Sequence, residues 1–252
     1  MISVEHLTRR FGSITAVNDL TLSVQEELFA FLGPNGAGKT TTIKMMTGLL
    51  KPSSGSIQIN GIDLLQNPIA AKRSFGLVME QPFLYEKLTA REFVRFTGRI
   101  YRIPEKDLQR RMAQLFELFE ISQRADDLIE NFSHGMKQKV ALICAMLHEP
   151  SVLFLDEPLV GLDPRAARSL KDLLRALVSK GTTIFMSTHI LEVAERLCDR
   201  VGIIHQGKLI ALGDLNALRS TTHDENGTLE DIFLQLTDTS KEESIQNCIR
   251  NL

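Results

Sequence analysis

Alternating apolar and polar positions mark the first part of the chain. Ile2 and Val4 flank one polar residue, and the pattern returns at Leu20, Leu22 and Val24. This alternation is typical of strands with one face in the core and the other in water. We predict an antiparallel sheet with one exposed face over residues 2–30, and another strand of the same kind at 56–60 after a turn at 51–55.

Between residues 82 and 147 the pattern becomes helical. Thr89 and Glu92 form a capping box, and the helix that follows carries Phe93, Phe96 and Ile100 on its predicted buried face. A basic stripe lies away from that face, at Arg91, Arg95, Arg99 and Arg102. We interpret the stripe as a solvated helix face, with contact to acidic lipid head groups or to a partner as the alternative.

Strands and helices alternate again after residue 150. The continuous apolar run at 151–155 is typical of a strand covered on both faces, and a second strand is predicted at 182–187. A hairpin is predicted over 201–212, with its turn at Gln206 and Gly207. With the apolar run at 28–32, this order predicts a right-handed parallel sheet. Residues 219–227 are polar and linker-like, and an amphipathic helix at 229–236 and an acidic tail follow.

Composition narrows the class of protein. The 252 residues are 43% hydrophobic and 24% charged, which suits one large or two small globular domains. The net charge of −2 provides no overall field for nucleic acid, so no nucleic acid partner is predicted. Cys144, Cys198 and Cys248 are widely spaced and are interpreted as reduced packing residues. No apolar run approaches the ~18 residues that a membrane span needs, so a membrane function would require another chain.

A phosphate-binding loop is predicted between the strand at 28–32 and the helix after residue 40. The segment fits G-x-x-x-x-G-K-[ST], and glycines there allow amide N–H groups to surround a polyphosphate. Lysine adds a point charge, and a threonine hydroxyl is a suitable Mg²⁺ ligand. The flanking strand and helix make a purely structural glycine-rich turn the weaker alternative. The predicted nucleotide-binding residues are Gly33, Pro34, Asn35, Gly36, Ala37, Gly38, Lys39, Thr40 and Thr41.

Acidic and histidine side chains follow the later strands. Asp156 is predicted to hold Mg²⁺ together with Thr40, and Glu157 to polarise an attacking water as general base; a helix N-cap cluster is the alternative. His189, after the next strand, is placed to reach a γ-phosphate, with a structural role as the alternative. Because ligands of parallel sheets bind beyond the carboxyl ends of the strands, we expect Lys39, Asp156 and His189 in one crevice.

Five ordered segments carry a resemblance to the ATPases of ATP-binding cassette (ABC) transporters: GPNGAGKTT, NFSHGMKQK at 131–139, VLFLDEP, GLDP at 161–164 and STH at 187–189. The resemblance implies an α/β P-loop NTPase (RecA-like) fold, with a parallel-sheet core, an antiparallel β subdomain and an inserted α-helical subdomain at about 83–147. It also implies an ATP-binding domain over 1–218, with the linker, short helix and tail at 219–252 outside it.

The resemblance also implies roles that the residues alone do not establish. Phe11 corresponds to an aromatic residue that stacks on adenine, although a Phe that only caps the small sheet is the alternative. Ser133 and Gly135 belong to a signature motif, Asp163 to a loop that couples two sites, and His189 to a switch histidine. The implied assembly contains two ATP-binding subunits, identical or different, with ATP and Mg²⁺ enclosed between them.

The function implied is that of an ATP-binding and hydrolysing subunit that powers transport, in the manner of exporters, through a separate transmembrane permease subunit. Such a subunit lies at the cytoplasmic side of the membrane. Two alternatives remain: a soluble cassette ATPase acting on ribosomes or DNA, and a regulatory nucleotide-binding module. The retained lysine, acidic pair and histidine argue against the second of these.

Two departures from the family pattern affect the predicted site. His134 occupies a glycine place and Met136 a glutamine place of the signature, and His134 either clashes with phosphate or donates a hydrogen bond to it. Glu80, rather than Gln81, falls at the glutamine that senses metal and attacking water. A carboxylate can bind Mg²⁺ but cannot donate a hydrogen bond. Our hypothesis is that Glu80 takes this catalytic and metal-binding role and slows turnover.

Overall fold

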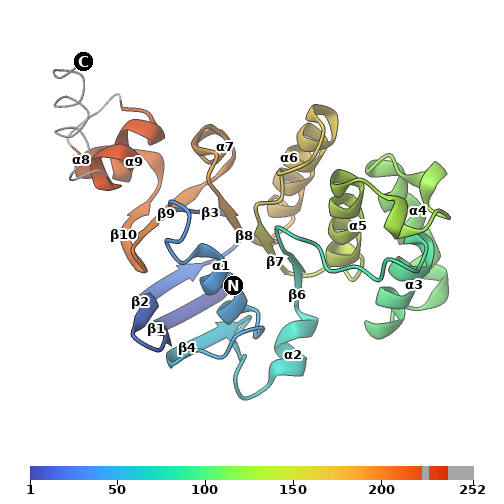
Figure 1. Ribbon diagram of the computed structural model, residues 1–252, viewed down its shortest axis with the longest axis horizontal. Coiled ribbons are helices and arrows are strands. Elements are labelled where there is room, and N and C mark those ends of the chain that lie inside the picture. Colours follow the sequence, from blue (N-terminus) through green and yellow to red (C-terminus); the bar gives the residue numbers. More distant parts are fainter. Residues whose placement is uncertain (223–226, 238–252) are drawn as a thin grey trace.

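The structure, a computed structural model, describes residues 1–222 and 227–237 and contains a mainly parallel sheet (Figure 1). Its strand order is β10-β9-β3-β8-β7-β6. Every residue of β3, β7 and β8 is buried, which explains why these runs show no alternation. The predicted α/β fold with a parallel core is therefore confirmed. The strands are β3 (Leu28–Leu32), β6 (Phe75–Val78), β7 (Val152–Asp156), β8 (Thr183–Thr188), β9 (Arg200–His205) and β10 (Lys208–Gly213).

The predicted hairpin at the edge of this sheet is also confirmed. β9 and β10 pair in antiparallel fashion, and the turn residues Gln206 and Gly207 have φ of 49° and 78°. Positive φ at both central residues is what a tight two-residue hairpin requires.

A smaller antiparallel sheet covers one face of the larger one. It contains β1 (Ile2–Phe11), β2 (Ile14–Val24), β4 (Ser54–Ile59) and β5 (Ile62–Asp63), in the order β2-β1-β4-β5. Its inner side chains share a core with Phe29, Phe31 and Phe185 of the larger sheet and with Ile43 of α1 (Lys39–Met46). The predicted alternation is confirmed, except that Phe11 ends β1 opposite Ile14 instead of lying in a turn.

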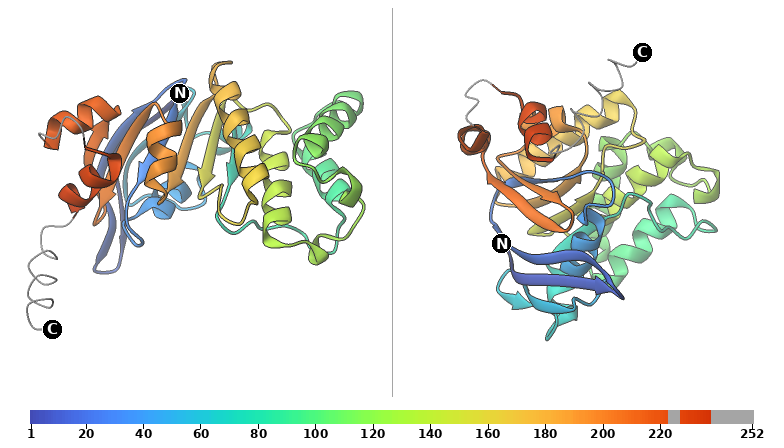
Figure 2. Two further views of the ribbon diagram at one scale, coloured as in Figure 1. Left: turned by 90° about the horizontal axis from the view of Figure 1, so that it is seen from above. Right: turned by 60° about the vertical axis from the view of Figure 1, so that its left-hand side comes forward.

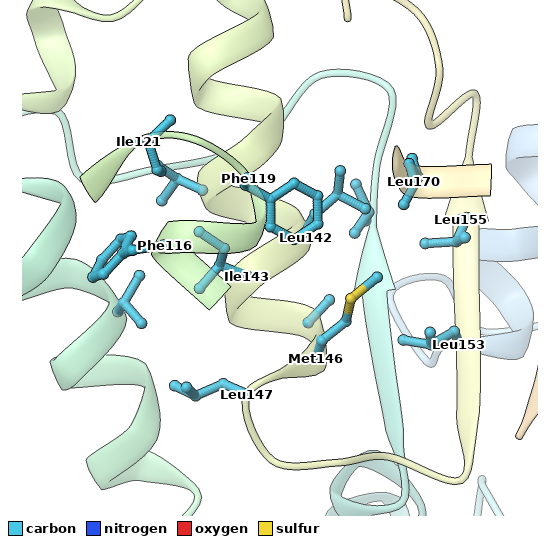
Figure 3. Close-up of a cluster of buried hydrophobic side chains, with 14 of the residues drawn as sticks. Phe116, Phe119, Ile121, Leu142, Ile143, Met146, Leu147, Leu153, Leu155 and Leu170 are labelled. Atoms are coloured by element: carbon cyan, nitrogen blue, oxygen red, sulfur yellow. The ribbon is translucent and has the colours of Figure 1, made fainter. Parts of the chain in front are cut away.

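Helices at one end of the larger sheet form the inserted helical subdomain. They are α3 (Ala90–Ile100), α4 (Glu105–Leu118) and α5 (His134–Met146), joined by 3-10 turns at Ser122–Arg124 and Ile129–Asn131, and α2 (Pro68–Arg73) precedes β6. Figure 3 shows how Phe116 and Phe119 meet Leu142 and Ile143 of α5. The same buried cluster includes Leu153 and Leu155 of β7, so the helices are anchored on the sheet.

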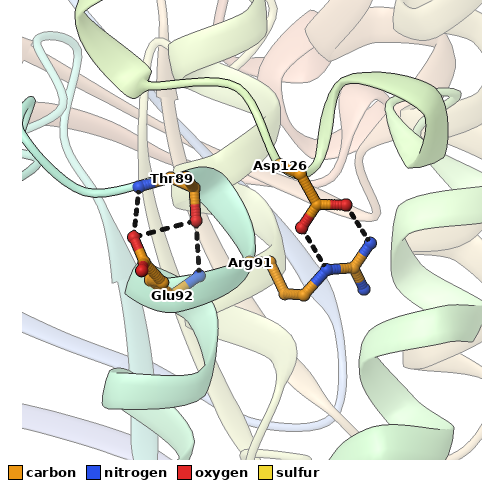
Figure 4. Close-up of polar contacts among 4 residues, drawn as sticks. All are labelled: Thr89, Arg91, Glu92 and Asp126. Atoms are coloured by element: carbon orange, nitrogen blue, oxygen red, sulfur yellow. Dashed lines mark hydrogen bonds and ion pairs between the residues drawn. The ribbon is translucent and has the colours of Figure 1, made fainter.

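The start of α3 matches its prediction but its buried face does not. Thr89 accepts a hydrogen bond from the Glu92 amide, and Glu92 accepts one from the Thr89 amide, which completes the capping box (Figure 4). The buried residues of α3 are Ala90, Val94 and Gly98. The predicted aromatic face is wrong, because Phe96 is 44% and Ile100 is 59% exposed, and Phe93 is only partly buried.

Close helix packing explains this difference. A Cβ at Gly98 would lie 2.3 Å from a methyl carbon of Leu108, so α3 presents its small residues to α4. Phe93 and Phe96 are left at the edge of the contact, where both rings lie near the ring of Tyr85. Periodicity identified the helix, but the neighbouring helix decided which face is buried.

Acidic side chains of the same subdomain pair with most of the basic stripe. Arg91 forms two hydrogen bonds with Asp126, at 2.6 Å and 3.0 Å (Figure 4). Arg95 and Arg99 lie 3.7 Å and 3.9 Å from carboxylate oxygens of Glu105. The pairs are largely exposed, so they fit a solvated helix face rather than a charged patch that awaits lipid.

The helices after β7 are α6 (Pro164–Val178), α7 (Leu191–Leu197), α8 (Leu215–Thr222) and α9 (Leu229–Thr237). α6 lies between α5 and α7 and packs on the middle of the larger sheet, whereas α8 and α9 lie at the opposite end of the molecule from α3–α5 (Figure 1 and Figure 2). The linker prediction at 219–227 is wrong for residues 219–222, which belong to α8. Asp214 explains the helix, because it accepts a hydrogen bond from the Ala217 amide at 2.8 Å and Leu218 is buried.

The predicted amphipathic helix is confirmed as α9 and docks on its own chain. Leu229 and Ile232 are fully buried in a cluster with Ala30 and Leu32 of β3. The boundary expected at residue 218 falls inside α8, and the division into domains stays a prediction. The predicted acidic tail lies outside the described residues, as does the middle of the linker at 223–226. Among the described helices, none combines the length and the apolar character that crossing a bilayer needs.

Candidate phosphate-binding site

The loop between β3 and α1 is held tightly against the rest of the molecule. Gly38, the N-cap of α1, has φ of 112°, and a Cβ there would lie 2.5 Å from the Ala16 carbonyl oxygen. Only glycine fits this conformation and this approach. A Cβ at Gly33 would likewise lie 2.4 Å from the Ile204 carbonyl oxygen. The loop is therefore fixed by β2 and β9 before any ligand binds.

Amide groups at the start of α1 have no protein acceptor. The N-cap offers no side-chain hydrogen bond, and within the described residues the N–H groups of Gly38, Lys39, Thr40 and Thr41 donate to no other group. A helix N-terminus with free amides and a positive dipole end is a ready anion site. The predicted phosphate loop therefore has the local structure that its sequence indicates.

The Lys39 side chain is folded over this loop. It is 8% exposed, and its Nζ donates to the Gly33 carbonyl at 2.6 Å and to the Pro34 carbonyl at 3.3 Å. Burial lowers the pKa of Lys39, and the carboxylates of Glu157, Asp156 and Glu80 oppose that shift. A cation surrounded by acidic groups and directed into a loop of free amides is suited to a phosphate chain.

The acidic pair lies at the carboxyl end of β7, whose last residue is Asp156, and both side chains are almost fully buried. The Ser187 hydroxyl donates to Asp156 Oδ1, whereas Asp156 Oδ2 has no partner within the described residues. The Glu157 N–H donates to the Ser187 carbonyl at 3.2 Å. Asp163, not either member of the pair, caps the next helix, α6, so the N-cap alternative does not apply.

Glu157 is held in an unusual conformation beside His189. Its φ is 50°, a left-handed value that costs a residue with a Cβ of order 1 kcal/mol or more. Glu157 Oε1 lies 2.9 Å from His189 Nδ1, and Oε2 is buried without a partner among the described residues. Strain of this kind persists when the surroundings impose it, and here it directs the carboxylate toward the phosphate loop.

One cavity of about 350 Å³ collects these groups. It contains Glu80 but not the neighbouring Gln81, which agrees with the alignment of Glu80. Ala16 of β2 was missed, because an alanine in a strand carries no chemical signal. The cavity is lined by Ala16, Pro34, Asn35, Gly36, Gly38, Lys39, Thr40, Thr41, Glu80, Asp156, Glu157 and His189. A cavity of about 390 Å³ between α4, α5 and α6 contains none of the predicted residues.

Other predicted residues lie elsewhere. Gly33 and Ala37 belong to the loop and are buried, but they do not line the cavity. Phe11 is 46% exposed at the end of β1, with the Arg9 guanidinium 4.5 Å from its ring centre. Ser133 is the N-cap of α5 and accepts a hydrogen bond from the Met136 amide at 3.3 Å, with Gly135 in the first turn. Asp163 caps α6 and lies 3.4 Å from Lys139.

The chemistry of the cavity fits a nucleotide polyphosphate with a divalent cation. Free amides and Lys39 suit phosphate oxygens, and the unpartnered Asp156 Oδ2 together with the Thr40 hydroxyl suits Mg²⁺. The described residues contain no cluster of three or more His, Cys, Asp or Glu side chains able to hold a metal. In phosphoryl-transfer sites Mg²⁺ commonly shares its coordination between one or two protein oxygens, phosphate and water, which suits Thr40 and Asp156.

Comparison with known proteins agrees with this chemistry. The family model described as ABC transporter matches residues 17–160. The linearmycin resistance ATP-binding protein LnrL of Bacillus subtilis is 36% identical over 253 residues, covering 100% of this chain and 79% of the relative. The bacitracin transport ATP-binding protein BcrA of Bacillus licheniformis is 40% identical over 212 residues, covering 83% of this chain and 68% of the relative.

Solved structures are similar as well. The ATP-binding subunit of an ABC transporter superimposes with a TM-score of 0.91 and 38% identity, covering 94% of this chain and all of that one. A dimeric ATP-binding cassette in a post-hydrolysis state, bound to ADP and phosphate, superimposes with a TM-score of 0.79 and 25% identity. It covers 85% of this chain and 99% of that one.

Proposed function

We propose a specific role in transport from the premise that this chain belongs to the ABC transporter family. It is an ATP-binding subunit of such a transporter, and it is an ATPase. ATP-binding subunits of this family dimerise and work with transmembrane components. The proposal is that this subunit powers export through a separate membrane-spanning subunit, from the cytoplasmic side of the membrane. Relatives named for linearmycin resistance and bacitracin transport support this direction.

The arrangement of Glu157 carries the catalytic part of the proposal. Its carboxylate lies in the same cavity as Lys39, with one oxygen held by His189 and the other free. We assign Glu157 as the general base for the attacking water and His189 as the group that fixes the carboxylate and faces the γ-phosphate. The contact between His189 Nδ1 and Glu157 Oε1 holds the Glu157 carboxylate in place while nucleotide binds.

The remaining residues bind and orient the triphosphate. The α1 amides and Lys39 hold the β- and γ-phosphates, and Thr40 and Asp156 would hold Mg²⁺ with Glu80 beside them. When bound, Mg²⁺ neutralises charge on the phosphate oxygens. Ser187 donates to one Asp156 oxygen, which fixes the carboxylate and leaves the other oxygen available. The exposed Phe11 is assigned to the adenine ring.

A second ATP-binding subunit completes the site. Ser133 and Gly135 at the start of α5, and Asp163 after Glu157, line no part of the cavity of their own chain. The N-terminus of α5 carries no acidic residue in its first turn, so it offers amides and a positive dipole end to an anion. We assign it to the γ-phosphate bound by the partner. Both a second copy of this chain and a different cassette fit this assignment.

An apolar surface beside the helical subdomain is assigned to the membrane subunit. A cavity of about 330 Å³ is lined by Leu49, Phe83, Phe93 and Tyr101. Phe83 is 92% exposed and Leu49 is 57% exposed, so large apolar groups face water together there. Phe83→Arg is expected to abolish co-purification of a hydrophobic subunit from detergent-solubilised membranes. Ile14→Arg, at the first residue of β2, which is 68% exposed, is the matched control and should retain it.

Phosphate release tests the catalytic assignment. Glu157→Gln keeps the size of the side chain but removes the base, so turnover should fall by roughly 10²–10⁴-fold while ATP still binds. Glu192→Gln, at an exposed position on α7, is the matched control and should hydrolyse ATP at the normal rate. Turnover of Glu157→Gln within a few-fold of the parent protein would remove this residue from the role of base.

Glu80 is tested separately, because its role is the departure from the family pattern. An ionised carboxylate repels phosphate and cannot donate to the attacking water, so Glu80→Gln should increase turnover. Gln81→Ala, next to it but outside the cavity lining, should leave turnover unchanged. A loss of activity in Gln81→Ala, with none in Glu80→Ala, would show that the loop has been placed incorrectly.

A further inference from the structure

The imidazole of His134 packs on a loop of its own chain. A Cβ placed on Gly161 would lie 2.4 Å from His134 Cδ2 and 3.2 Å from Nε2, so the ring lies directly over Gly161. A Cβ on Gly135 would lie 2.4 Å from the Gly161 carbonyl oxygen. The first turn of α5 therefore touches the loop between β7 and α6 without a gap. The His134 ring fits in this position because Gly161 has no side chain.

The loop under the ring begins at the catalytic carboxylate. Residues 158–162 connect Glu157 with Asp163 through two tight turns. The Val160 N–H donates to the Glu157 carbonyl at 3.2 Å, and the Leu162 N–H donates to the Leu159 carbonyl at 3.3 Å. A displacement of Gly161 is therefore passed to the Glu157 backbone, whose φ of 50° leaves it little freedom.

A second contact ties the same helix to the far end of the loop. Lys139 of α5 is 8% exposed, and its Nζ lies 3.4 Å from Asp163 Oδ2. Asp163 also accepts the Ala166 amide at 2.8 Å, which starts α6. The loop is thus fixed to α6 at Asp163 and to β8 at Glu157, and α5 touches it at Gly161 and Asp163. The ring of His134 contacts the middle of the loop, at Gly161.

We propose that His134 is a positioning residue for ATP hydrolysis: its ring fixes Gly161, and through Gly161 the loop that places Glu157. This inference rests on the proposed function, in which the α5 N-terminus faces the nucleotide of a second subunit. In each subunit, α5 then contacts the nucleotide bound by the partner and also the loop that places its own Glu157. Closure of the two subunits therefore affects the position of Glu157 through α5. A glycine in place of His134, as in the usual family motif, lacks this contact.

Packing of the His134 ring on Gly161 is a different role from donating a hydrogen bond to phosphate. Two variants distinguish these two roles. His134→Ala removes the ring, and His134→Phe keeps a flat ring over Gly161 but has no N–H to donate. We expect His134→Ala to lower kcat by roughly tenfold or more, because small misplacements of a catalytic group are costly. The KM for ATP should stay unchanged. His134→Phe should restore most of the lost kcat.

Three further measurements complete the experiment. ATP-driven dimerisation, measured by sedimentation with Mg-ATP in the Glu157→Gln background, should be the same for His134 and His134→Ala. Melting temperatures should agree within about 2 °C, because His134 is exposed and exposed substitutions usually change stability little. Gly161→Ala should be less harmful to kcat in the His134→Ala background than alone, because its Cβ meets the His134 ring.

Each result decides the proposal. Equal kcat for His134→Ala and the parent protein overturns it. Equal loss in His134→Phe and His134→Ala, with weaker dimerisation, overturns it in favour of a phosphate contact, and a lowered melting temperature for His134→Ala overturns it in favour of a structural role. A parent protein that neither hydrolyses ATP nor dimerises with it refutes the proposed function instead, which keeps the two failures distinguishable.

Discussion

Replacing Lys39 by Met tests the phosphate loop most directly. The Lys39 ammonium group is buried and lies 2.6 Å from the Gly33 carbonyl oxygen, next to the free amides at the start of α1. Phosphate bound to these amides would lie within a few ångströms of the ammonium group. Two unit charges 4 Å apart are worth about 4 kcal/mol at an effective dielectric constant of ~20. Since each 1.4 kcal/mol is tenfold, loss of this interaction should raise the Kd for ATP by about 10³.

The assay is the shift in melting temperature on adding Mg-ATP, measured in the Glu157→Gln background so that the nucleotide persists. ATP at 100 times its Kd stabilises the folded state by about 2.7 kcal/mol. For a chain of 252 residues this corresponds to a shift of about 5–10 °C. With Kd raised about 10³-fold, the stabilisation falls below ~0.1 kcal/mol and the shift disappears.

Lys44→Met is the matched control, because Lys44 lies on the same helix but is exposed and outside the cavity. It should keep the full shift. The comparison uses the difference with and without ATP, so a change in the melting temperature of the free protein does not affect it. A Lys39→Met protein that retains more than half of the normal shift would refute the placement of phosphate beside Lys39.

Substitutions at three other positions test the structure away from the phosphate loop. Thr89→Ala removes the side-chain half of the α3 capping box and should cost about 1 kcal/mol, or about 2–4 °C in melting temperature, whereas Thr89→Ser should cost less. Gln138 is fully buried with no partner for its amide among the described residues, so Gln138→Met should raise the melting temperature; a fall would reveal an unseen partner. Burial lowers the pKa of His148, whose ring stacks on Tyr101 at 3.7 Å. Its stabilising contribution is therefore present above the ordinary pKa of 6.5 and is lost as pH falls through the lowered folded value. His148→Phe should accordingly lose less stability between pH 7.5 and pH 5 than the parent protein, as measured by thermal melts.

The convergence of Lys39, Asp156 and His189 was predictable from sequence because it depends on topology alone. Each lies at or beyond the carboxyl end of a strand, and the carboxyl ends of parallel strands share one edge of the sheet. The direction of each side chain was not predictable. Glu157 contacts His189 with its backbone at φ of 50°, and no sequence pattern predicts a left-handed backbone conformation at a glutamate.

The errors share a physical origin in contacts between distant segments. Phe96 and Ile100 were expected in the core, yet Gly98 brings α3 against Leu108 and leaves them outside. Residues 219–222 were interpreted as linker from their polarity, although Asp214 starts a helix that continues through them. The roles of Ser133, Gly135 and Asp163 depend on a second subunit, and they stay predictions.

The position of β3 in the sheet has a consequence for biosynthesis. β3 lies between β8 and β9, with Leu28 opposite Ile184 and Phe29 opposite Arg200. The strand that precedes the phosphate loop thus finds its hydrogen-bonding neighbours only after some 150 further residues have been translated. Loop closure over such a separation is slow. Until β8 and β9 have emerged, both hydrogen-bonding edges of β3 lack their partners, so the strand that precedes the phosphate loop joins its sheet only then.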